Sequence, residues 1–116
     1  MDILKSKKRT LYKAPLFLKY LQDTWYKINC ENILYIEASS NGAIFHMDDG
    51  SDFCSSEHLA GLQAELPVYF ERIHRSFIVN INHISNIDTV HKTIQINERV
   101  NLSLGNIYKK NIYWYL

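Results

Sequence analysis

Short runs of branched and aromatic residues, separated by turn-forming residues, recur along most of this chain. Such runs are typical of β-strands, because branched and aromatic side chains pack well on a pleated surface. No apolar run approaches the ~20 residues that a membrane-spanning helix needs. The expected strands cover residues 16–20, 24–28, 33–37, 43–47, 51–54, 84–87, 93–96 and 100–104. The pattern therefore predicts a mainly β fold of short strands.

Turn-forming residues join neighbouring runs. Gln22-Asp23 separates the first two runs, and Asp48-Asp49-Gly50 separates 43–47 from 51–54. An Asp-Gly pair tolerates the positive φ that a hairpin turn requires. These turns favour antiparallel pairing of the strands that they connect.

One segment has a clear helical pattern. Leu59, Leu62 and Leu66 are spaced to share one face, and Pro67 ends the helix. We expect Ser55 or Ser56 to cap this helix, which then begins at Glu57.

The segment 106–114 fits either a second short helix or an extended tail. The pattern as a whole predicts a single domain over residues 1–116, with antiparallel sheets and one short helix near residues 56–66.

Composition limits the class of protein. The chain has 116 residues, 47% of them apolar, which is enough for one hydrophobic core. The basic cluster at residues 5–9 is not followed by the apolar segment of a signal peptide. Cys30 and Cys54 are too few for a disulfide framework, so we expect both to be small buried residues. The sequence predicts a soluble, cytoplasmic protein.

Charge is unevenly distributed although the net charge is only +1. Residues 1–27 hold seven Lys or Arg against two acids, and residues 72–116 hold six against two. Residues 28–71 hold eight acids and no Lys or Arg. Such separation can place a positive face beside a negative one, or it can be a chance difference between solvated faces.

Motifs for catalysis or metal binding are missing from the sequence. Cys54 and His58 have a spacing that suits a metal, but the other four histidines supply no second close pair. The acidic turn lacks the alternating ligands of a calcium loop. No Gly-rich phosphate loop or Gly-x-Ser-x-Gly elbow occurs. We therefore expect no enzyme activity, no cofactor and no metal.

The most informative stretch is 69–80, in which His74-Arg75-Ser76 lies between apolar residues. The guanidinium of Arg75 matches a guanine edge or a phosphate, and the Ser76 hydroxyl can donate to a phosphate oxygen. The alternative is that Arg75 forms a surface salt bridge. The expected core anchors around the trio are Phe70, Ile73, Phe77 and Val79.

Three segments together resemble the LytTR DNA-binding domains of bacterial response regulators. They are Asn32-Ile33-Leu34-Tyr35-Ile36-Glu37-Ala38, the helix 59–66 with Phe70-x-Arg72-Ile73-His74-Arg75-Ser76-Phe77-Ile78-Val79-Asn80, and Ile84-x-x-Ile87 followed by a hairpin and Leu102-Ser103. Their order and spacing make the match specific, and it covers about residues 16–112.

The resemblance implies an elongated stack of small antiparallel sheets, about ten strands in all, with one short helix. It also implies that loops, rather than a recognition helix, read successive major grooves of duplex DNA. The matching loops are 39–42, 74–76 and 103–106. The DNA-binding candidates are Arg75, His74, Ser76, Asn41, Ser40, Ser103, Asn106, Lys109 and Lys110.

Two departures from the family pattern concern base reading. Relatives often carry a large polar or aromatic residue near Gly42 and a basic residue near Leu104 or Gly105, and this chain has neither. Asn41, Asn106 or Lys109 can substitute.

The function that the resemblance implies is sequence-specific transcription regulation in a bacterial two-component system. Two copies are expected on each DNA site, together with an N-terminal receiver domain or a partner protein outside this chain. The alternative is a β-rich protein-interaction or small-ligand module, in which the eight tyrosines and two tryptophans line a pocket. A positive ridge around Arg75, Lys109 and Lys110 favours DNA, and a neutral concave pocket favours the alternative.

Overall fold

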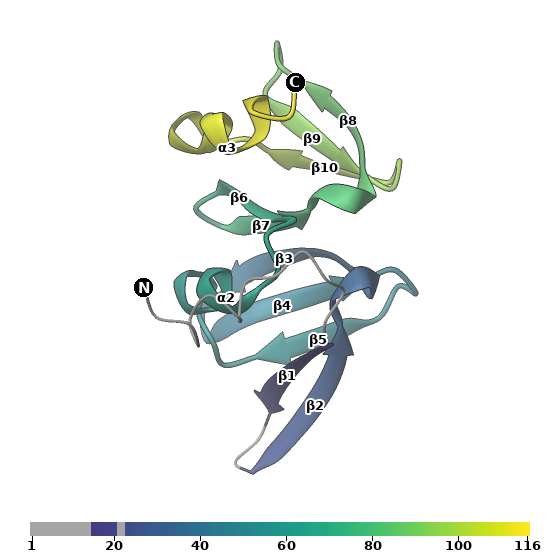
Figure 1. Ribbon diagram of the computed structural model, residues 1–116, viewed down its shortest axis with the longest axis vertical. Coiled ribbons are helices and arrows are strands. Elements are labelled where there is room, and N and C mark those ends of the chain that lie inside the picture. Colours follow the sequence, from purple (N-terminus) through teal and green to yellow (C-terminus); the bar gives the residue numbers. More distant parts are fainter. Residues whose placement is uncertain (1–14, 21–22) are drawn as a thin grey trace.

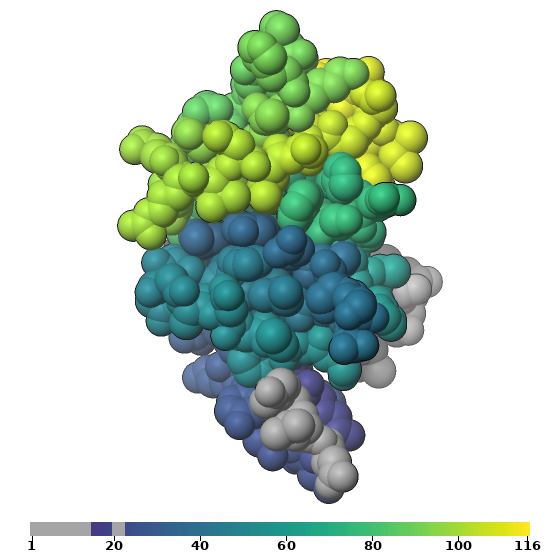
Figure 2. Space-filling model, turned by 180° about the vertical axis from the view of Figure 1, so that it is seen from behind, coloured from purple at the N-terminus to yellow at the C-terminus, as the bar shows by residue number. Residues whose placement is uncertain are grey.

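The computed structural model of this protein describes residues 15–20 and 23–116. Across these residues ten strands form three antiparallel sheets, which stack along the long axis of the molecule (Figure 1). The extents along the principal axes are 45, 35 and 24 Å. Figure 2 shows the elongated outline from behind, with the C-terminal residues at one end and the first two strands at the other. The predicted stack of small antiparallel sheets is confirmed.

A two-stranded sheet lies at one end of the stack. It pairs β1 (Pro15–Tyr20) with β2 (Thr24–Asn29). Leu16 and Leu18 of β1 are buried, whereas β2 is mostly exposed. The predicted turn at Gln22-Asp23 lies partly outside the described residues, which do not include Gln22.

The central sheet has five strands in the order β5-β4-β3-β7-β6. These are β3 (Ile33–Ser39), β4 (Gly42–Met47), β5 (Asp52–Ser55), β6 (Phe70–His74) and β7 (Phe77–Asn80). In the middle of the sheet β3 pairs with β7, which places Ile36 opposite Ile78 and Tyr35 opposite Val79. The β4–β5 hairpin turns at Gly50, whose φ is +88°, as the Asp-Gly pair predicted.

The third sheet has the order β10-β9-β8. Its strands are β8 (Ile84–Asp88), β9 (Thr93–Ile96) and β10 (Val100–Ser103). The 3-10 turns η1 (Cys30–Asn32) and η2 (Ile81–His83) lead into β3 and β8. After β10 the chain forms η3 (Asn106–Tyr108) and helix α3 (Lys109–Tyr113), so the undecided segment 106–114 is largely helical.

Two hydrophobic cores lie on opposite faces of the central sheet. Ile36 and Ile78 belong to the first core, together with helix α2 (Leu59–Glu65). Tyr35 and Val79 belong to the second core, together with the third sheet and α3. Because successive side chains of a strand point to opposite faces, both faces of β3 and β7 are buried. This double burial explains why their sequences are almost continuously apolar.

Helix α2 begins later than predicted. It starts at Leu59, and its N-cap is His58, whose side chain makes no capping hydrogen bond. The prediction that Ser55 or Ser56 caps a helix beginning at Glu57 is wrong. Ser55 ends β5, and its Oγ accepts a hydrogen bond from the Glu57 N–H (3.1 Å) before the helix begins.

Most of the residues expected in the core are buried: Cys30, Leu59, Leu62, Leu66, Phe70, Ile73 and Val79. Phe77 is only half-buried and packs at the edge of the second core. The prediction that Cys54 is buried is wrong, because its side chain lies on the solvent face of the edge strand β5. Over the described ranges no helix has the length and apolarity needed to span a membrane.

Replacement of Gly42 tests how tightly β4 packs against β5. Gly42 has φ +148°, and a Cβ at this position would lie 2.1 Å from the carbonyl oxygen of Ser55. Gly42→Ala therefore combines backbone strain with a clash against main-chain atoms. We expect it to lower the free energy of unfolding by about 2–4 kcal/mol, measured by urea denaturation.

Gly61→Ala is the matched control for this experiment. Gly61 lies inside α2, where an added Cβ meets no atom within 4 Å. Alanine at an open helical position should raise the free energy of unfolding by about 0.5–1 kcal/mol. Equal stability of the two variants would contradict the close packing at Gly42.

Candidate nucleic-acid interface

The three loops singled out in the sequence lie side by side at one edge of the structure. The Ala38 N–H donates to the Ser76 carbonyl (2.8 Å), which joins the β3–β4 turn to the β6–β7 turn. The Gly105 N–H donates to the Ile73 carbonyl (2.7 Å), which joins the β6–β7 turn to the loop after β10. We call residues 39–42, 74–76 and 103–106 the loop ridge. Main-chain hydrogen bonds thus hold its parts together.

Arg75 lies at the tip of the β6–β7 turn, and its side chain is exposed. His74 and Phe77 pair across this turn, and the Ser76 N–H donates to Nδ1 of His74 (3.1 Å). Within residues 15–20 and 23–116 no acidic side chain pairs with Arg75. In this part of the chain the guanidinium is therefore available to a ligand.

A second arginine supports the same turn from within. The Nε of Arg72 donates to the His74 carbonyl (2.8 Å), and its Nη2 donates to the Arg75 carbonyl (2.5 Å). The residue is partly buried, in contrast to Arg75. The two arginines therefore have opposite orientations, one toward the backbone of the turn and one toward solvent.

The first loop of the ridge presents Ser40 and Asn41, which are both exposed. Gly42 is buried against the backbone of Ser55 and Ser56, and no side chain fits at this position. The structure thus gives a physical reason for the departure from the family pattern at Gly42. The polar groups that this loop presents to solvent are therefore the side chains of Ser40 and Asn41.

The third loop presents Ser103 and Asn106, which are exposed, and buries Leu104. A Cβ on Gly105 would lie 3.1 Å from Cδ2 of Tyr108 and 3.6 Å from Cδ2 of His74. Of these two atoms only the Tyr108 carbon would be closer than ordinary contact, so the loop packs closely against the ring of Tyr108. Little space remains at Gly105 for the basic side chain that relatives often have there.

Lys92 supplies a positive charge beside this loop, and the sequence interpretation missed it. Its Nζ donates to Oδ1 of Asn106 (2.6 Å), and its carbonyl accepts from the Leu104 N–H (2.9 Å). The β9–β10 register pairs Thr93 with Ser103, which places residue 92 beside residue 104. The two expected strands 93–96 and 100–104 could have revealed this neighbour, had their register been inferred.

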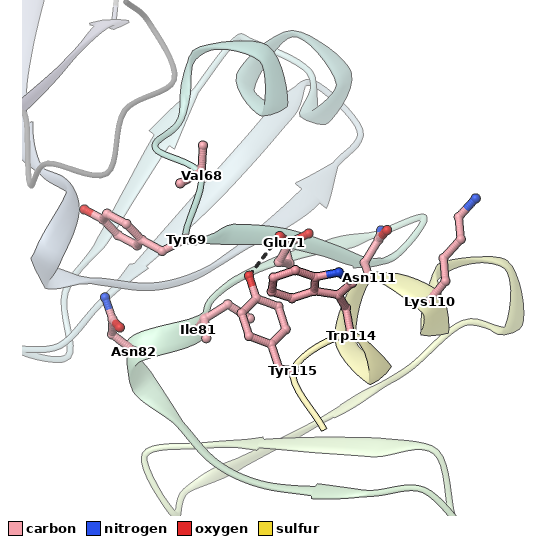
Figure 3. Close-up of a pocket in the computed structure, with 9 residues that line it drawn as sticks. All are labelled: Val68, Tyr69, Glu71, Ile81, Asn82, Lys110, Asn111, Trp114 and Tyr115. Carbon is pink, nitrogen blue, oxygen red and sulfur yellow. Dashed lines mark hydrogen bonds between the residues drawn. The ribbon is translucent and has the colours of Figure 1, made fainter.

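Lys109 and Lys110 lie on α3, immediately after the loop ridge, and both are exposed. The structure thus brings seven of the nine candidate residues onto the loop ridge and places these two lysines on the adjoining helix. In Figure 1, α3 and the β6–β7 turn project to the same side of the molecule. Lys110 also lines a pocket, with its amine pointing away from the other lining residues (Figure 3).

That pocket, of about 620 Å³, is the concave site that the alternative function requires. Tyr69, Trp114 and Tyr115 contribute its aromatic surface. The Tyr115 hydroxyl donates to Oε1 of Glu71 (3.1 Å; Figure 3). Burial, with smaller contributions from Cys30 and Glu31, raises the pKa of Tyr69 to about 12, so this phenol stays neutral near pH 7. Glu71 and Lys110 also line the pocket, so its surface is aromatic but carries charged side chains.

The acidic turn at the end of the β4–β5 hairpin lies away from the loop ridge. The turn at Asp48 and Asp49 follows the last residue of β4, whereas Gly42, the first residue of β4, belongs to the loop ridge. At ~3.3 Å per residue the six residues of β4 separate the two ends by about 20 Å. Among the described side chains no three His, Cys, Asp or Glu lie close enough together to hold a metal ion.

Comparison with known proteins agrees with this geometry. A family model described as the LytTr DNA-binding domain matches residues 23–114. A search of curated proteins finds no match. Among solved structures, the chain is similar to a Bacillus cereus chain described as the LytTr DNA-binding domain of a methyl-accepting/DNA response regulator. The two are 24% identical with a TM-score of 0.72, and the match covers 89% of this chain and 96% of that chain. Because the family model covers most of its residues, the chain belongs to the LytTR family of DNA-binding domains.

Proposed function

We propose that this chain binds duplex DNA sequence-specifically through the loop ridge, as the output domain of a bacterial transcription regulator. The observation that carries the proposal is Arg75, an exposed guanidinium on a turn whose backbone is fixed from both sides. A guanidinium donates two parallel hydrogen bonds to O6 and N7 of guanine, which is the commonest specific contact in the major groove. Arg75 is therefore assigned to a base edge.

The neighbouring loops supply the contacts that fix register on the duplex. Ser40, Ser76 and Ser103 can donate hydroxyl hydrogen bonds to phosphates, and such contacts position a protein without reading sequence. Lys92, next to Asn106, takes the place of the basic residue that relatives often carry near Gly105. Asn41 carries an amide that matches the N6 and N7 edge of adenine.

The three loops lie side by side, so they can contact one face of the DNA together. We propose that they enter the major groove from that face. We further propose that two copies occupy one DNA site, and that the domain works with an N-terminal receiver domain or with a partner protein. In this role the domain works in the cytoplasm and performs no catalysis.

The first prediction concerns the salt dependence of DNA binding. Binding that neutralises Z phosphates has a slope of about −0.9Z in a plot of log affinity against log salt concentration. Lys92, Lys109 and Lys110, together with Arg75, suggest roughly three to four neutralised phosphates, and hence a slope of about −3 to −4. Fluorescence anisotropy with a labelled duplex selected from random sequence measures this slope. A slope near zero, or no binding at low salt, would overturn the proposed function.

The second prediction separates base reading from phosphate contact. Arg75→Ala should cost about 1–3 kcal/mol of binding free energy and relax the preference at one base pair. Lys92→Ala should weaken binding to all sequences alike and flatten the salt slope by about one unit. Selection of bound sequences by each variant, combined with salt titration, measures both effects.

Arg99→Ala provides the matched control, since it removes the same charge at a different place. Arg99 is exposed in the β9–β10 turn, at the opposite end of these strands from Lys92. It should leave affinity within about twofold, because charges beyond ~8 Å are screened at physiological salt. If folded Arg75→Ala protein keeps its full base preference, base reading belongs to Asn41 or Asn106 instead.

A further inference from the structure

Arg72 contacts the loop ridge and also contacts two neighbouring elements, α2 and η3. Besides the carbonyls of His74 and Arg75, its Nη1 donates to Oε1 of Gln63 on α2 (3.4 Å). Its guanidinium carbon also lies 5.6 Å from the centre of the Tyr108 ring in η3. One side chain thus contacts the central turn, the helix beneath it and the segment that follows the third loop.

The main chain at Arg72 adds a further link to the same segment. Nδ2 of Asn111 on α3 donates to the Arg72 carbonyl (2.9 Å). The Tyr108 N–H donates to the Gly105 carbonyl (3.0 Å), so the residue stacked on Arg72 also closes the third loop. A displacement of Arg72 would therefore disturb the central turn and the third loop together.

The backbone of the central turn needs such support. The β6–β7 register shifts between Arg72 and His74, which marks a bulge, and the Arg75 carbonyl lies in the turn outside the paired residues. A bulge redirects the side chains that follow it, and backbone carbonyls in turns need a donor from elsewhere. The planar fork of Arg72 supplies donors to two successive carbonyls at once.

We propose that Arg72 is a positioning residue for DNA recognition, which fixes the turn that carries Arg75 and couples it to the third loop without contacting DNA itself. This inference rests on the proposed function. It assigns different roles to two arginines only three residues apart. Lysine cannot replace arginine in this role, because a single ammonium lacks the rigid planar set of donors.

The first test observes the support directly in DNA-free protein. In a nitrogen–proton NMR spectrum, the Nε–H of Arg72 should exchange with water at least about tenfold more slowly than that of Arg75, because it is hydrogen-bonded. Exchange of both groups at the same rate would overturn the inference without affecting the proposed function.

The second test measures the coupling by a double-mutant cycle on DNA affinity. Arg72→Lys keeps the charge and should lower affinity for the selected duplex about tenfold, while affinity for unrelated duplex stays within about twofold. In the Arg75→Ala background the same change should alter specific affinity by less than about twofold, since the residue that Arg72 positions is already lost. Arg99→Lys is the conservative control and should have no effect. Thermal unfolding confirms that each variant is folded at the assay temperature.

The NMR experiment and the double-mutant cycle together distinguish a wrong role for Arg72 from a wrong proposed function. If Arg72→Lys costs the same factor with and without Arg75, Arg72 acts independently and the inference is wrong. If Arg72→Gln flattens the salt slope by about one unit while Arg72→Lys retains wild-type affinity, Arg72 contacts a phosphate and the inference is equally wrong. If wild-type protein binds no duplex, the proposed function fails and the role in recognition fails with it, whatever the exchange rates are.

Discussion

The pairing of β3 with β7 is the interaction on which the rest of the structure depends. Both strands are buried on both faces, so that neighbouring residues such as Ile78 and Val79 pack into different hydrophobic cores. Burial of apolar area is the largest favourable contribution to folding, and here a single strand pair contributes to two cores at once. Where this pair ends, the Ala38–Ser76 hydrogen bond places the first two loops of the interface next to each other. The loop ridge is thus an extension of the part of the sheet that is buried on both faces.

Much of the fold was predictable because burial leaves a strong pattern in the sequence. Apolar side chains mark the runs 33–37 and 93–96 and the leucines of α2, because these residues are buried in the two cores. The two predicted strands and the predicted helix were confirmed. Predictions that depended on single polar or small residues were weaker. The sequence predicts Ser55 as a helix cap, whereas it ends a strand, and it predicts Cys54 in a core, whereas this residue lies exposed on an edge strand. Such residues tolerate several environments, so only tertiary pairing decides among them.

The candidate site was predictable only in part, for a related reason. The resemblance to the LytTR family identified the three loops, and the structure places them together. Lys92 and the supporting contacts of Arg72 were missed, since both depend on partners far away in the sequence. Lys92 meets Asn106 across 14 positions, and Asn111 meets Arg72 across 39. The local sequence pattern does not show which residues meet across such separations. The register of paired strands does show it, as at Lys92.

The hydrogen bonds that join the three loops are made by backbone atoms and so do not depend on which side chains the loops carry. Exposed positions such as Ser40, Asn41 and Ser103 can therefore change without loosening the arrangement of the loops. Under the proposed function, a scaffold of this kind permits evolution to alter a target sequence one loop at a time, while the spacing between the loops stays constant. It also makes the domain a practical starting point for engineered regulators, in which new reading residues are chosen on a frame that already holds them at fixed positions.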